Sequence, residues 1–280
     1  MTAPLQELRQ FKVQEPVPGY WRVVFSNPPV NLLNSTTIVE IGEIVRRIET
    51  AQDLRVVVFA SENPEFFMAR YDLSDPNPIG FAPTVAGVTQ FIDSTIRLNN
   101  VGAITIASIR GRARGGGSEF ALACDFRFAS LEKTLLGQPE VGVGIVPAGG
   151  GLERLSGLVG VARALEIIAS SDDYDAPTAE RYGWINRAIP NRKLDAFVDT
   201  LARRLASFDA PALATAKRLV RRHASPPIED YRETLASLRT LIASPATATR
   251  RAALAKHAAA VGKDFELRMG HHLGLVGARK

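Results

Sequence analysis

The sequence predicts an α/β protein, in which a core with a parallel sheet is followed by a helical C-terminal region. Three observations lead to this fold class. A strand, a helix and a second strand follow one another between residues 20 and 61, this alternation continues to about residue 190, and from Leu194 onward almost every segment is helical. Alternating strands and helices favour a parallel sheet with right-handed crossovers. We therefore divide the chain into an α/β core, residues 1–193, and a helical region, residues 194–280.

Composition and spacing mark the first strand–helix–strand unit. Residues 20–26 (YWRVVFS) are rich in the β-branched and aromatic residues that are typical of strands. Prolines and asparagines then indicate an irregular loop over residues 27–34. A helix is predicted from Ser35, whose hydroxyl can cap it, and residues 54–61 (LRVVVFAS) form a buried strand. The helix has apolar residues at helical spacing: Ile38, Ile41, Val45 and Ile48.

The later elements continue the alternation. Residues 73–83 are rich in proline and glycine and are expected to form a mobile surface loop. A helix at about Val85–Leu98 and a strand at Ala103–Ile109 precede a glycine-rich segment, a short helix and the strand DFRFAS. Another helix and a short strand end at Pro190. The next helix is amphipathic, and a further helix follows Asp209 with Pro211 in its first turn. The apolar side of the amphipathic helix consists of Leu194, Phe197, Val198, Leu201 and Leu205.

Composition excludes several classes of protein. The 280 residues are 46% hydrophobic and 22% charged, which is usual for a globular chain, and no apolar run is long enough to cross a bilayer. The net charge of +5 is spread along the chain, and the richest stretch, KRLVRR at 217–222, indicates a solvated helix face. We expect neither a nucleic-acid nor a membrane partner. The single cysteine, Cys124, excludes a disulfide framework and a cysteine metal site, so we expect a buried inert thiol in a cytoplasmic protein.

The segment RGGGSEFALAC, residues 114–124, joins three glycines to an apolar helix that carries a glutamate in its first turn. It lacks the lysine of a phosphate-binding loop, the spacing of a dinucleotide fingerprint and the pattern of a nucleophile elbow. Glycine N–H groups at a helix N-terminus can instead form an oxyanion hole that stabilises an enolate. Glu119 would then serve as an acid or base beside it, the alternative being a carboxylate that simply suits the helix dipole.

An ordered set of motifs resembles the enoyl-CoA hydratase/isomerase (crotonase) family. GRARGGGSEFALACDFRFAS is similar to the family's G-x-A-x-G-G-G-x-E-L-A-x-A-C-D segment. SNPPVNLLN, FFMARYDL, GQPEVGVGIVPAGGGLERL, DAPTAERYGWINRAIP and LARRLASFDAPALATAKRLV resemble further family segments in the same order. The likeness runs from about Ser26 to Val220, whereas the ending KDFELRMGHHLGLVGARK is not the usual one.

The resemblance implies a crotonase-like spiral of βαβ turns and a helical C-terminal oligomerisation region that forms a homotrimer or a dimer of trimers. It also implies an acyl-CoA thioester substrate, with no metal and no cofactor beyond the coenzyme A of the substrate. The oxyanion donors would be the backbone N–H groups of Tyr71 and Gly116. The two hydratase carboxylates would be Glu119 and Glu140, and both being present favours hydration of a 2,3 double bond. The substrate-binding positions would be Ala69, Arg70, Asp72, Gly115 and Ala148.

Some positions depart from the family pattern. Arg70 and Tyr71 stand where glycine and alanine are common, and Arg112 and Arg114 replace aromatic or aliphatic residues. These two arginines would contact CoA phosphates, lie on the surface or form salt bridges between subunits. Three functions therefore stay open: an enoyl-CoA hydratase, another crotonase-type reaction such as isomerisation or thioester hydrolysis, and a CoA- or RNA-binding protein without turnover.

Simple structural roles are the alternatives for other polar residues. Glu140 could be a loop carboxylate, although its neighbours are apolar, and Asp72 is expected to cap a loop or helix. All four histidines lie in the helical region, and no ligand spacing supports a metal site there. His271 and His272 are expected to be a solvated pair.

Overall fold

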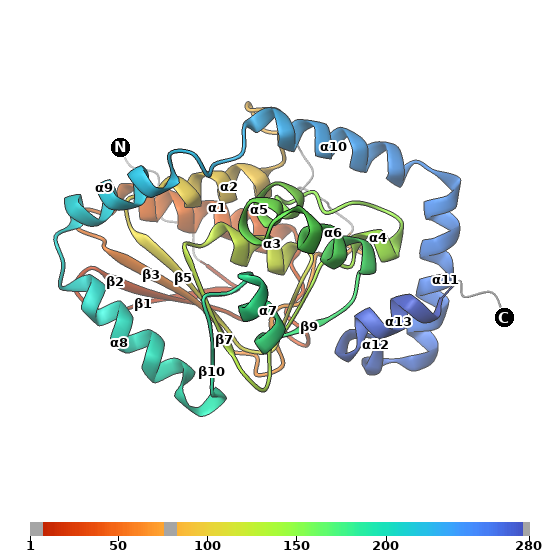
Figure 1. Cartoon of the computed structure of the whole chain (residues 1–280), viewed down its shortest axis with the longest axis horizontal. Helices are drawn as coiled ribbons and strands as arrows, with labels where there is room; N and C mark the ends of the chain where they lie inside the picture. Colours follow the sequence, from red (N-terminus) through yellow and green to blue (C-terminus); the bar gives the residue numbers. More distant parts are fainter. Residues whose placement is uncertain (1–7, 76–82, 277–280) are drawn as a thin grey trace.

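The computed structural model describes residues 8–75 and 83–276, and two sheets form the centre of this part of the chain (Figure 1). The larger sheet has the strand order β1-β2-β3-β5-β7-β10. Its strands are β1 (Phe11–Val17), β2 (Tyr20–Phe25), β3 (Val56–Ser61), β5 (Ile104–Ile109), β7 (Phe126–Ser130) and β10 (Arg187–Ile189). β1 and β2 form an antiparallel hairpin, and every other neighbouring pair is parallel. The predicted α/β core with a parallel sheet is therefore confirmed.

A second, four-stranded sheet has the order β4-β6-β8-β9. Its strands are β4 (Phe66–Met68), β6 (Arg112–Arg114), β8 (Leu135–Gly137) and β9 (Tyr174–Asp175). β3, β5 and β7 of the larger sheet are each followed by one of these short strands, so the chain repeats the same turn through both sheets. The sequence analysis missed this sheet, because two or three residues are too few to show a period.

Helices from the first half of the chain cover the sheets. They are α1 (Ser35–Thr50), α2 (Gln90–Asn100) and α3 (Gly116–Ala123). α1 buries its predicted isoleucines and valine, but its cap is Asn34 rather than Ser35. The Asn34 side chain accepts from the Thr37 N–H, whereas the Ser35 N–H and hydroxyl donate to Asp75. α2 begins five residues later than predicted, because the Thr89 side chain caps it.

Helices dominate the second half, as predicted. They are α4 (Glu140–Val143), α5 (Gly151–Val159), α6 (Val161–Ser170), α7 (Ala176–Tyr182), α8 (Leu194–Ala206), α9 (Ala210–Arg221), α10 (Ile228–Ile242), α11 (Pro245–Val261), α12 (Lys263–Leu267) and α13 (Met269–Leu275). α8 packs on the larger sheet, with Leu194 and Val198 against Tyr20 and Val56. α10 and α11 instead form an arm that reaches round to α4, with α12 and α13 at its end (Figure 1).

Two expectations about polar residues are wrong. Lys217 of the KRLVRR stretch is not solvated, because its ammonium is buried in an ion pair of 2.7 Å with Asp125. His272 is not solvated either, since it is buried between His257, 3.0 Å away, and Asp264, 2.9 Å away.

Other expectations hold or lie outside the described residues. Cys124 is buried, and burial raises the pKa of its thiol to about 12, as expected for an inert core residue. Most of the predicted loop at 73–83 falls on residues 76–82, which the structure does not describe. Within the described ranges, none of the helices has the length and apolar character needed to cross a membrane.

Candidate active site

A cavity of about 650 Å³ lies between the N-terminus of α3, the segment after β4 and the helices of the C-terminal arm. Most of its wall is apolar, with side chains such as Val143, Leu254 and Phe265. The charged residues on the wall are Arg70, Asp72, Glu119, Glu140 and Arg251. Four of these five residues belong to segments that the sequence singles out, so most of the predicted site residues converge on one cavity.

The three consecutive glycines, Gly115, Gly116 and Gly117, lie where a side chain would clash or would enter the cavity. Gly115 has φ +47°, which favours glycine, and a Cβ there would lie 2.5 Å from a carboxylate oxygen of Glu140. A Cβ on Gly117 would lie 1.9 Å from the Met68 carbonyl oxygen, so α3 touches the backbone of β4. Gly116, between them, lines the cavity. The glycines thus let a helix N-terminus sit directly on a strand end with its first turn open to the cavity.

The two predicted oxyanion donors lie at the same part of the wall. Gly116 is the first residue of α3, so no turn of the helix precedes it to accept its N–H. Around Tyr71, the Arg70 carbonyl accepts from Leu33 and the Asp72 N–H donates to Leu33. Neighbouring N–H groups of an extended segment alternate in direction, so the Tyr71 N–H points away from Leu33. A Cβ on Gly116 would lie 3.8 Å from that nitrogen.

Glu119 is held at the cavity by backbone amides. Its side chain is buried, and Oε1 accepts from the N–H groups of Gly149 and Gly151, at 2.7 and 3.0 Å. Burial raises the pKa of Glu119 to about 7, although the two amides act in the opposite direction. Arg154 supports this loop by donating to the Gly149 carbonyl at 3.1 Å. Sequence analysis missed these supports, for which the glycine run PAGGG was the only signal.

Glu140 is the first residue of α4 and faces the same cavity. Its Oε2 atom is buried and has no hydrogen-bond partner in the described part of the chain. Burial, and then the negative charge of Glu119, raise the pKa of Glu140 well above its ordinary value. The two carboxyl groups therefore titrate as an interacting pair, and the protonated form of Glu140 is favoured.

The remaining predicted positions divide between the wall and the layer behind it. Arg70, Asp72 and Ala148 line the cavity. Asp72 also caps its own loop, since Oδ1 accepts from the Ser74 N–H at 2.9 Å. Ala69 and Gly115 are not among the residues that line the cavity. Ala69 is buried, and its N–H donates to the Asn31 carbonyl while its carbonyl accepts from the Arg114 N–H. No group of residues in the described ranges has the composition and proximity of a metal site.

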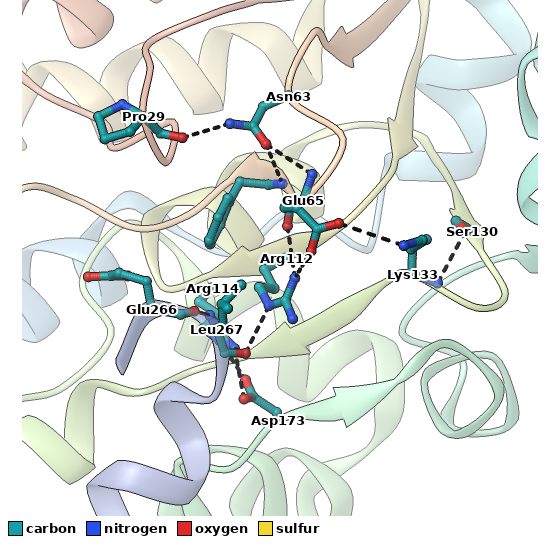
Figure 2. Close-up of polar contacts among 11 residues, drawn as sticks. Pro29, Asn63, Glu65, Arg112, Arg114, Ser130, Lys133, Asp173, Glu266 and Leu267 are labelled. Carbon is teal, nitrogen blue, oxygen red and sulfur yellow. Dashed lines mark hydrogen bonds and ion pairs between the residues drawn. The ribbon is translucent and has the colours of Figure 1, made fainter. Parts of the chain in front are cut away.

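The arginines that depart from the family pattern hold the C-terminal region of the same chain (Figure 2). Arg114 forms a bidentate pair with Asp173, at 2.5 and 2.8 Å, and donates to the Glu266 carbonyl at 2.7 Å. Arg112 donates to the Leu267 carbonyl at 2.9 Å.

Arg70 completes this group through an ion pair of 2.5 Å with the Glu266 side chain. All three arginines thus meet the C-terminal segment at residues 266–267. Intrachain contacts of this kind were not among the roles considered for Arg112 and Arg114.

Comparisons with known proteins agree with this architecture. A family model described as enoyl-CoA hydratase/isomerase matches residues 19–256. The short-chain-enoyl-CoA hydratase of Clostridium acetobutylicum is 32% identical over 73% of this chain and 78% of its own length. The carnitinyl-CoA dehydratase of Citrobacter koseri is 30% identical over 74% of this chain and 79% of its own.

The fold of one solved structure extends over nearly the whole chain. The crystal structure of "a putative enoyl-CoA hydratase from Streptomyces avermitilis" has a TM-score of 0.90 and 35% identity, and covers 99% of this chain and 100% of its own. The similarity thus includes the C-terminal arm. From the family match and these relatives we conclude that the chain belongs to the enoyl-CoA hydratase/isomerase family.

Proposed function

We propose that this protein adds water across the 2,3 double bond of an acyl-CoA thioester. One observation carries the proposal: two carboxyl groups with raised pKa values, Glu119 and Glu140, line one cavity together with Gly116 at the start of α3. Hydration needs a base for the attacking water and an acid for the α-carbon, and this arrangement offers both.

The surroundings of the two carboxyls support different roles. Two amides hold Glu119 and favour its charged form, so it accepts a proton from water while the oxygen attacks the β-carbon. In the described part of the chain no other residue donates to the Glu140 carboxylate, and its raised pKa favours the protonated form, so it gives a proton to the α-carbon. The water thus supplies the hydroxyl group, and the proton that Glu119 takes up replaces the one that leaves Glu140.

Negative charge develops on the thioester oxygen as water attacks. We infer that the Gly116 and Tyr71 N–H groups receive it, and each such donor is worth about 10²–10³ in rate. Because both donors belong to the backbone, the bulk of the Tyr71 side chain is compatible with this role. The apolar wall supports an acyl substrate, and the reaction needs no cofactor beyond the coenzyme A that the substrate carries.

A panel of 2-enoyl-CoA esters tests the proposal. We expect loss of the conjugated thioester absorbance, together with a product that has gained the mass of one water. An isomerase would give a product of unchanged mass, and a thioester hydrolase would release free CoA thiol. Either result, or binding without turnover, would contradict the proposed hydration.

A further inference from the structure

The position of Glu140 depends on the backbone of α4. α4 is a single turn of four residues, and no side chain caps its N-terminus. Glu119 has two amides that fix its carboxylate, but the structure shows no hydrogen bond from another residue in its described ranges to the Glu140 carboxylate. The contacts that hold the α4 backbone therefore also determine the position of the Glu140 carboxyl group in the cavity.

The C-terminal arm holds α4 through Arg250 of α11. The Arg250 guanidinium donates from Nε to the Gly142 carbonyl at 2.8 Å and from Nη2 to the Leu273 carbonyl at 2.7 Å, and Nη1 donates to the Val276 carbonyl. Gly142 belongs to α4, Leu273 belongs to α13, and Val276 directly follows α13. One planar group thus joins the carbonyl ends of two helical segments, whose last carbonyl groups have no N–H donor within the helix and carry partial negative charge.

Two further contacts strengthen this junction. The buried Thr247 side chain of α11 donates to the Gly144 carbonyl at 2.8 Å, directly after α4. The Leu273 side chain packs so closely on Gly142 that a Cβ there would lie 3.0 Å from Leu273 Cδ1. Arg250 itself does not line the cavity.

We propose that Arg250 is a positioning residue, which fixes Glu140 for proton transfer by holding the Gly142 carbonyl of α4 against the C-terminal arm. The inference rests on the proposed function, because it gives Glu140 a proton to deliver. The C-terminal segment of this chain, whose sequence does not resemble the usual family ending, therefore helps to position the carboxyl group of Glu140. A lysine cannot replace Arg250, since an ammonium lacks the planar fork that reaches three carbonyls on two segments.

The test compares Arg250→Gln with Arg55→Gln. Arg55 is a matched control, because its Nε and Nη1 also donate to backbone carbonyls, of Phe208 and Asp53, but it does not line the cavity or touch α4. We expect Arg250→Gln to lower kcat by about 10- to 100-fold, the scale of a displacement of about 1 Å, with little change in KM. Arg250→Lys should lose nearly as much, and Arg55→Gln should keep wild-type kcat.

A double variant separates positioning from general damage. If Arg250 acts through Glu140, adding Arg250→Gln to Glu140→Gln should lower kcat by less than about twofold more. The inference would be overturned if Arg250→Gln lowered kcat as much in Glu140→Gln as in the wild type. It would also be overturned if folded Arg250→Gln kept the wild-type kcat. Should Arg250→Gln fail to fold, Thr247→Val removes one hydrogen bond to the same segment. It should lower kcat several-fold in the wild type but not in Glu140→Gln, and equal losses in both would overturn the inference.

Hydrogen exchange gives a readout that does not need activity. Amides of residues 143–145 close the α4 turn through bonds to Pro139, Glu140 and Val141. A peptide covering this turn should exchange faster in Arg250→Gln than in the wild type, and unchanged in Arg55→Gln. Unchanged exchange in Arg250→Gln would remove the structural link. A wild type that hydrates no enoyl-CoA would instead refute the proposed function and the catalytic part of this inference, whatever the exchange shows.

Discussion

Adjacent glycines at the start of α3 should fail in different ways when each is changed to alanine. At Gly116 the new methyl group would lie 2.9 Å from the end of the Leu33 side chain and 3.8 Å from the Tyr71 nitrogen. The side chain can shift, so we expect Gly116→Ala to fold with a stability within about 2 kcal/mol of the wild type. At Gly117 the methyl group would lie 1.9 Å from the Met68 carbonyl oxygen, which is backbone. Gly117→Ala should therefore lose at least about 3 kcal/mol.

Gly116→Ala, although it should fold, is expected to lose catalytic activity. A thioester oxygen that accepts from both donors must lie about 2.7–3.1 Å from each nitrogen. A methyl group on Gly116, 3.8 Å from the Tyr71 nitrogen, would crowd this approach. Alanine keeps its backbone N–H, so the loss comes from blocked access of the thioester oxygen to this donor, which should lower kcat by about 10²–10³, or roughly 2.7–4 kcal/mol in the barrier. Urea denaturation measures the stability of both variants, and enoyl-CoA hydration measures kcat of the folded ones. A Gly116→Ala enzyme with near wild-type kcat, or a Gly117→Ala protein as stable as the wild type, would refute this reasoning.

Three further predictions concern stability and assembly. Arg114 is buried and pairs with Asp173, so Arg114→Gln should destabilise the fold by about 3–5 kcal/mol; a loss below 1 kcal/mol would show that this pair is not needed. Glu119 binds its proton more tightly when folded, with a pKa of about 7 against an ordinary 4.5, so its contribution to stability is full below pH 4.5 and is lost as pH rises through 7. Glu119→Gln should therefore be more stable than the wild type at pH 8 by at most about 3 kcal/mol, with no such gain at pH 4.5; a gain independent of pH in thermal melts would contradict this. From the family resemblance we expect a homotrimer or a dimer of trimers, and light scattering that gives the 30.3 kDa of one chain would contradict it.

Apart from the edge strand β1, which was not predicted, the sequence predicts the strands of the larger sheet better than the geometry of the site. Strands such as Val56–Ser61 carry long β-branched runs, and helices such as α8 carry a clear apolar face, so periodicity is enough to find them. The glycine segment and Glu119 were identified because three residues without side chains need a steric reason. That both glutamates would belong to one site was predicted from the resemblance to the family motifs, since their spacing along the chain does not indicate it.

Long-range polar contacts could not be predicted from single positions. Arg112 and Arg114 meet residues more than 150 positions away, and nothing in their local sequence indicates this. His272 likewise lies beside His271, and its local sequence does not indicate its partners, yet tertiary packing buries it against His257 and Asp264. The positions of such residues depend on which distant segments pack together, and a local sequence pattern does not reveal this.

The most direct test of the central claim measures enoyl-CoA hydration by the wild type, Glu119→Gln, Glu140→Gln and the double variant. Glutamine keeps the size of glutamate but cannot accept and return a proton. If the two carboxyls act on one water, each single change should lower kcat by about 10²–10⁴ with little change in substrate affinity, and the double variant should be little worse than the poorer single. If Glu140→Gln stays near wild type while Glu119→Gln is inactive, the two-carboxylate hydration is wrong, and a reaction that uses one carboxylate takes its place.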